Sequence, residues 1–157
     1  GLSMPPKKPT IDDAARAQIR DATAVYGTAY ECLFEAQWDE AAQVVTSARL
    51  VTRGSRDAVQ MLAGCFAPGS IHLHTHPEGA WVEPSSADLE TAARMAMIGC
   101  GSAICSPSAD SLFLICSPVM IRHFSPPAPD RKTIFKAGRF SLFHWTEQRF
   151  FQIILTH

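Results

Sequence analysis

The segment from residue 70 to residue 101 constrains the fold most, because its periodicity changes from that of a strand to that of a helix. Side chains alternate from Ser70 to Thr75, so that one face of the predicted strand carries His72 and His74. Pro77 ends this strand and opens a loop that runs to Pro84. Apolar residues then recur at helical spacing up to the glycines at 99 and 101, at Leu89, Ala92, Ala93, Ala96 and Met97. A strand, a loop and a packed helix predict an α/β fold.

The flanking segments predict one more helix and several strands. An N-terminal helix is indicated by apolar residues at helical spacing before Gly27, with Thr10 and Asp13 as a capping box: Ile11, Ala15, Ile19, Ala22 and Tyr26. Strands are predicted at Tyr30–Trp38, Gln43–Val51, Ala103–Cys105, Leu112–Cys116 and Val119–Phe124. The apolar stretch Phe140–Leu155 fits a helix or strands. We therefore expect one domain over residues 4–157, with helices around a single mixed sheet.

Composition fits a globular chain and disfavours two classes of partner. The 157 residues are 46% hydrophobic and 18% charged, which is enough for one sizeable core. A net charge of -1 gives no positive field for nucleic acid, and no apolar run approaches the roughly 20 residues of a membrane span. The N-terminus lacks the pattern of a secretory signal, so we expect a cytoplasmic protein with reduced cysteines. Residues 1–3, before Met4, resemble the remnant of a cleaved tag.

Two histidines and one aspartate form a candidate metal site. His74 and His76 are two residues apart, so on a strand their imidazoles project from the same face, roughly 6 to 7 Å apart. Asp88 falls in the first turn of the next predicted helix. Catalytic zinc sites take three protein ligands, often two histidines and a carboxylate, and leave a fourth position for water. Other interpretations remain open: Ser85 and Asp88 as a capping box alone, the histidines as surface imidazoles, and His72 as a packing residue.

The same residues resemble a known motif. His74-Thr75-His76-Pro77, a spacer and Ser85-Ser86-Ala87-Asp88 resemble the JAMM motif of the JAB/MPN metalloproteases, and the order of predicted elements is similar to that fold. The resemblance implies a curved mixed sheet and one catalytic zinc ion held by His74, His76 and Asp88. It also implies that Ser85 hydrogen-bonds the tetrahedral intermediate. A glutamate between the first helix and the first strand would act as general base; Glu31 fits that position, and Glu35 is the alternative.

The resemblance further implies a substrate class. It predicts a peptidase or isopeptidase that cleaves at the C-terminal tail of a ubiquitin-like or sulfur-carrier-like protein, or of its conjugates. A non-catalytic MPN-type scaffold is the alternative from another class, although such scaffolds usually lose metal ligands and this chain keeps all three. A DNA-repair branch of the same fold is disfavoured by the near-neutral charge.

Overall fold

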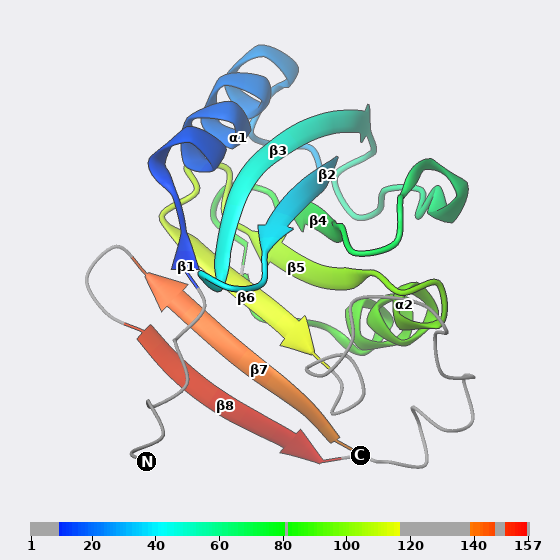
Figure 1. Ribbon diagram of the computed structural model, residues 1–157. Coiled ribbons are helices and arrows are strands. Elements are labelled where there is room, and N and C mark those ends of the chain that lie inside the picture. Colours follow the sequence, from blue (N-terminus) through cyan, green and yellow to red (C-terminus); the bar gives the residue numbers. More distant parts are fainter. Residues whose placement is uncertain (1–9, 81, 117–138, 147–149, 157) are drawn as a thin grey trace, which may run out of the picture.

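The computed structural model describes residues 10–80, 82–116, 139–146 and 150–156 (Figure 1). These residues form two α-helices, one short 3-10 helix and eight strands. In chain order they are β1 (Thr10–Ile11), α1 (Asp13–Tyr26), β2 (Cys32–Asp39), β3 (Val44–Arg53), η1 (Ala63–Cys65), β4 (Ile71–Thr75), α2 (Ser86–Met97), β5 (Gly101–Cys105), β6 (Ser111–Cys116), β7 (Arg139–Thr146) and β8 (Phe150–Thr156). The expectation of a mixed α/β chain is confirmed.

All eight strands belong to one curved sheet in the order β1-β3-β2-β4-β5-β6-β7-β8 (Figure 1). Two pairs are parallel, β1 with β3 and β4 with β5, and the other neighbours are antiparallel. Parallel neighbours need a crossover connection, and α2 supplies it between β4 and β5. The sheet is therefore mixed, as the sequence predicts, and β4 lies in its interior.

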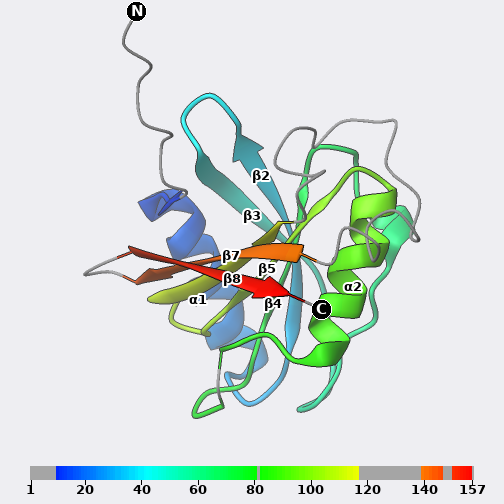
Figure 2. The same ribbon diagram turned by 90° about the horizontal axis from the view of Figure 1, so that it is seen from below.

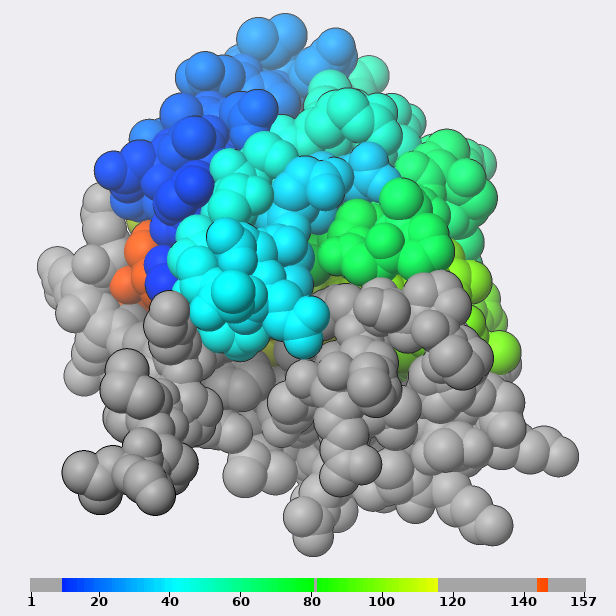
Figure 3. Space-filling view, viewed as in Figure 1, coloured from blue at the N-terminus to red at the C-terminus, as the bar shows by residue number. Residues whose placement is uncertain are grey.

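The two helices lie on opposite sides of the sheet (Figure 2). Helix α1 packs on β3 and β2, whereas α2 packs on β5 and β6. Figure 3 shows α1 and the β2–β3 hairpin covering much of the described part of one face. Alternating strand residues pack into both layers, so Phe34, Leu73 and Ile104 are fully buried, as is Ile19 of α1. Strand β4, which carries His74, is buried along its whole length.

The N-terminal helix is where the sequence predicts it, but its predicted cap is wrong. Thr10 is extended and pairs with Val44 as part of β1, so its hydroxyl does not cap the helix. The cap is Asp12, whose carboxylate accepts from the Ala15 N–H at 2.9 Å. The predicted stop at Gly27 is correct: this residue has φ 92, a conformation that L side chains rarely adopt.

The C-terminal stretch that the sequence leaves open forms a hairpin of β7 and β8. The predicted strand Val119–Phe124 and residues 1–3 lie outside the described residues. The cysteines at 32, 65, 100 and 105 are free thiols, as expected. Among the described residues, none of the helices is both long and apolar enough to cross a membrane.

Candidate metal centre

His74 and His76 occupy the end of β4 and the residue just beyond its last position. His74 is paired with Leu33 of β2 on one side and Ile104 of β5 on the other, and its side chain is buried. His76 follows β4, but its N–H donates to the Cys105 carbonyl at 3.1 Å. That bond continues the β4–β5 pairing, so both imidazoles lie on one face with ring centroids 5.2 Å apart.

Asp88 reaches the same point from the start of α2. The Ser85 hydroxyl accepts from the Asp88 N–H at 3.2 Å, and Asp88 Oδ2 accepts from the Ser85 N–H at 2.9 Å. This is the capping box that the sequence predicts as the plainer interpretation. Asp88 also faces the histidines, with Oδ1 3.1 Å from His74 Nε2 and Oδ2 3.2 Å from His76 Nε2. Capping and contact with the imidazoles therefore coexist in one side chain.

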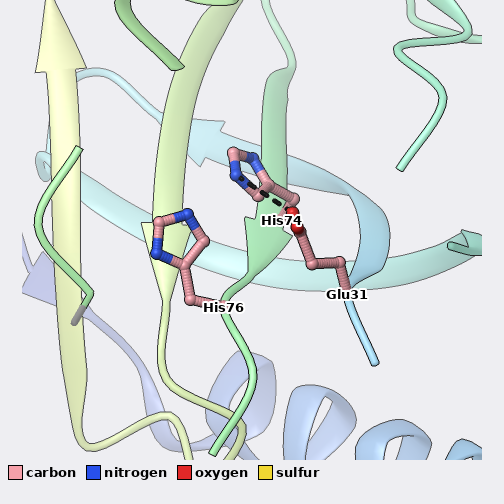
Figure 4. Close-up of side chains that lie close together, drawn as sticks. All are labelled: Glu31, His74 and His76. Atoms are coloured by element: carbon pink, nitrogen blue, oxygen red, sulfur yellow. Dashed lines mark ion pairs between the residues drawn. The ribbon is translucent and has the colours of Figure 1, made fainter. Parts of the chain in front are cut away.

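Glu31 completes the cluster from the residue before β2. Its N–H donates to the Ser55 carbonyl at 2.8 Å, and its carbonyl accepts from the Gly54 N–H at 2.7 Å, which fixes its backbone. Its Oε1 lies 3.7 Å from His74 Nε2, the ion pair drawn in Figure 4. Ligand atoms of Glu31, His74 and His76 all lie within 4.8 Å of one another, so this group can hold a metal ion.

Burial and the neighbouring imidazoles set the charge state of the two carboxylates. Burial raises the pKa of Glu31, and attraction to His74 and His76 offsets only part of that rise. Burial would also raise the pKa of Asp88, but hydrogen bonds from both imidazoles hold it well below its usual range. Asp88 is therefore the firmly ionised carboxylate, and Glu31 is the one that accepts a proton more readily.

Ser85 and Glu35 stand apart from this cluster in different ways. Ser85 is exposed at the N-terminus of α2, where its hydroxyl caps the helix beside Asp88. Glu35 pairs with His72 in the sheet, but its carboxylate is bonded elsewhere: to Arg49 at 3.1 Å and to the Ala67 N–H at 3.0 Å. These bonds lower the pKa of Glu35, the backbone bond from Ala67 most of all. The structure brings Glu31, and not Glu35, to the two imidazoles.

His72 is buried beside the cluster and packs against neighbouring residues. Its ring is buried and packs on Phe66 with centroids 4.9 Å apart, and Nε2 lies 3.0 Å from the Met61 carbonyl oxygen. Burial lowers the pKa of His72 to about 4, so the ring is neutral at pH 7. Its position agrees with the packing role considered from the sequence.

The sequence does not reveal the segment that closes the site. A pocket of ≈ 130 Å³ beside the cluster is lined by Glu31, His72, His74, Asp88 and Thr91, and also by Asp57, Ala58, Val59 and Met61. Residues 57–61 have no periodic pattern and belong to neither a helix nor a strand, so no local signal assigns them to a site. Their position depends on the long connection between β3 and β4.

The donor set is one that can hold a metal ion. Imidazole nitrogens and carboxylate oxygens are ligands that zinc takes, and here two of the first and two carboxylates converge within a few ångströms. The group that can hold an ion consists of Glu31, His74 and His76, so it contains the residue to which the resemblance gives proton transfer and does not include Asp88, to which the resemblance gives a ligand role. Asp88 instead contacts both of these histidines. Comparison with known protein families and with curated proteins finds no match to this chain. Its chemistry has to be argued from the site itself.

Proposed function

We propose that this chain is a zinc-dependent peptidase or isopeptidase of the JAMM type with a JAB/MPN-like fold. The observation that carries the proposal is the convergence of two imidazoles and two carboxylates between the end of β4 and the start of α2. Those residues are the ones that the His-Thr-His-Pro and Ser-x-x-Asp motifs contribute, together with the upstream glutamate. The order helix, strands, helix, strands around a curved mixed sheet supports the same assignment.

In this proposal His74, His76 and Asp88 hold the ion, and Glu31 is the general base. Asp88 lies closer to the histidines than Glu31 does, at 3.1 and 3.2 Å against 3.7 Å, and it contacts both. A ligand has to be ionised, as a carboxylate is near neutral pH, and Asp88 presents one oxygen to each imidazole. A base has to accept a proton near neutral pH, and burial moves the pKa of Glu31 in that direction.

In this proposal, amide hydrolysis needs a Lewis acid, a group that transfers a proton and a group that stabilises the oxyanion, and each of these roles has a candidate. When bound, zinc supplies a Lewis acid that lowers the pKa of a coordinated water toward about 7. Glu31 takes a proton from the attacking water and returns it to the leaving amine. Ser85 already accepts from the Asp88 N–H, and its own O–H remains able to donate to the oxyanion that forms on the substrate.

The substrate class follows from the resemblance to the JAMM motif: the extended C-terminal tail of a ubiquitin-like or sulfur-carrier-like protein. A pocket of ≈ 130 Å³ lies beside the cluster and is lined by Glu31, His74 and Asp88, which gives the scissile bond a place next to the proposed ion. Peptide and isopeptide bonds present the same amide, so both kinds of linkage are candidates.

The decisive experiment replaces Glu31 with Gln and uses Glu35→Gln as the matched control. Both variants remove one carboxylate from the β2 region, but only Glu31 faces the imidazoles. Zinc content is measured on the purified proteins, and hydrolysis is followed on C-terminal peptide fusions of ubiquitin and of a sulfur-carrier protein. We expect Glu31→Gln to keep about one zinc per chain and to lose at least 100-fold in rate, while Glu35→Gln keeps its rate.

Each other outcome points to a specific error. Loss of zinc in Glu31→Gln would make Glu31 a ligand and not the base. If activity is lost in Glu35→Gln alone, Glu35 and not Glu31 would be assigned as the general base. A wild-type protein that carries no zinc and cleaves neither fusion would contradict the enzyme assignment and favour the partner-binding scaffold.

A further inference from the structure

The backbone of Glu31 is held by a turn that follows β3. Strand β2 begins only at Cys32, so Glu31 lies just outside it. The Glu31 N–H donates to the Ser55 carbonyl at 2.8 Å, and the Glu31 carbonyl accepts from the Gly54 N–H at 2.7 Å. The proposed general base therefore depends on residues 54 and 55 for its place beside the imidazoles.

Hydrogen bonds to one serine close this turn. The Ser55 N–H donates to the Ala58 carbonyl at 2.8 Å. The Ser55 hydroxyl oxygen accepts from the Ala58 N–H at 3.2 Å and from the Asp57 N–H at 3.4 Å. Serine hydroxyls commonly stabilise turns in this way. Residues 55–58 are all exposed, so these bonds, and not burial, keep the shape of the turn.

Gly54 lies where the turn folds back on itself. A Cβ atom added to Gly54 would lie 2.1 Å from the Ala58 carbonyl oxygen and 2.7 Å from Val59 Cα. Both are backbone atoms, which cannot rotate away as the end of a side chain can. Because real Cβ contacts are essentially never shorter than 3.0 Å, alanine at this position would force the two sides of the turn apart.

The same turn forms part of the wall of the pocket beside the metal centre. Asp57, Ala58 and Val59 line this pocket together with Glu31 and His74. A shift of the turn would therefore move the proposed base and the pocket wall, but not the strand and the helix that carry the proposed ligands. Misplacing a catalytic group by about 1 Å can cost on the order of 100-fold in rate.

We propose that the turn at residues 54–58 positions the general base, with Gly54 and Ser55 as its positioning residues. The inference rests on the proposed function and deepens it, because it gives the placement of Glu31 a cause outside the metal cluster. The turn supplies none of the proposed ligands, so substitutions in it separate placement of the base from binding of the ion.

The test compares Gly54→Ala with Gly64→Ala, which makes the same change where an added Cβ meets nothing within 4 Å. Gly64 is an exposed residue of η1. Zinc content is measured on each purified protein, and kcat and KM are measured on the same C-terminal fusions. Amide hydrogen exchange at Glu31 and Cys32 is followed by NMR. Cys32 serves as the internal reference, because its N–H donates to Thr75 and not to the turn.

We expect Gly54→Ala to keep about one zinc per chain and a KM within about threefold of wild type, and to lose roughly 100-fold in kcat. Amide exchange should accelerate at Glu31 and stay slow at Cys32. Gly64→Ala should match the wild type in every one of these measurements.

Ser55 allows a second and milder perturbation. Ser55→Ala removes the hydroxyl that closes the turn and should lower kcat by roughly two- to tenfold. Ser55→Thr keeps a hydroxyl at the same place and should retain the wild-type rate. This pair decides the question if Gly54→Ala does not fold.

Wild-type kcat or unchanged exchange at Glu31 in a folded Gly54→Ala would overturn the inference, and so would equal rates in Ser55→Ala and Ser55→Thr. In those cases the zinc content and activity of the wild type would still support the proposed function. A wild type that binds no zinc and cleaves neither fusion would overturn the proposed function, and this inference with it.

Discussion

Thr75, between the two candidate ligands, offers a sharp test of how the site is held together. Its hydroxyl oxygen accepts from the Cys32 N–H at 3.0 Å, and both residues are fully buried. Cys32 follows Glu31 directly, so this bond ties the end of β4 to the start of β2 beside the proposed general base. Thr75→Val keeps the shape of the side chain and removes the hydroxyl, including the acceptor for the Cys32 N–H.

The expected loss follows from the burial of that donor. A buried N–H that loses its partner costs about 1 to 3 kcal/mol, and Thr75 has no exposed surface through which water replaces it. For a chain of this length, each kcal/mol corresponds to a fall of about 2 to 4 °C in Tm. Urea unfolding monitored by circular dichroism measures the free energy, and amide hydrogen exchange at Cys32 should accelerate in the variant.

Thr52→Val is the matched control. Thr52 is a half-buried threonine of β3 whose hydroxyl makes only a long 3.4 Å contact with the next residue's carbonyl, at a partly exposed position. We expect its free energy of unfolding to change by less than about 0.5 kcal/mol. Equal losses in the two variants, or unchanged exchange at Cys32 in Thr75→Val, would refute the reasoning.

Two further substitutions test the cap and the pH dependence. Ser85→Ala should lower the free energy of unfolding by about 1 kcal/mol, because the Asp88 N–H loses its acceptor, whereas Ser86→Ala, one residue on and exposed, should be nearly neutral in the same urea titration. Glu35→Gln tests how stability depends on pH. The folded protein holds the pKa of Glu35 below its usual 4.5, so the ionised Glu35 side chain stabilises the fold above pH 4.5, and this stabilisation is lost as the pH falls through the lowered pKa. The variant should therefore be less stable than wild type at pH 7, and the difference should shrink as the pH falls through the lowered pKa, with Glu40→Gln, at an exposed turn residue, as the control in the same titration.

Much of the fold can be predicted from local patterns because those patterns report packing directly. Strand alternation at residues 70–75 and the helical stripe after Ser85 both reflect faces that are buried in the structure. The cap of α1 could not be chosen in this way, because Thr10 and Asp12 are both good capping residues. Pairing of Thr10 with Val44, a contact between distant residues, decides between them.

The same distinction applies to the site. That His74, His76 and Asp88 lie together can be predicted from sequence because their spacing is local to one strand, one loop and one helix. Glu31 and Glu35 share strand parity, so from sequence only their positions relative to the first helix favour Glu31, and tertiary contacts are needed to separate them further. Arg49 and the Ala67 N–H bind the Glu35 carboxylate, and that choice depends on contacts 14 and 32 residues away in sequence. The place of residues 57–61 beside the pocket could not be predicted from sequence either, because only the tertiary fold brings them to the cluster.

Asp88 shows why the two interpretations of Ser-x-x-Asp are not rivals. A capping aspartate has one oxygen on the backbone of the cap residue, which fixes its side-chain torsions at little extra entropic cost. Once fixed, Oδ1 and Oδ2 face two imidazoles at nearly equal distances, 3.1 and 3.2 Å. In the proposed function, a carboxylate already held by its own helix loses less freedom when an ion binds, so the capping box would pre-organise the proposed ligand. The capping box is therefore compatible with the proposed ligand role of Asp88 and would lower the entropic cost of binding the ion.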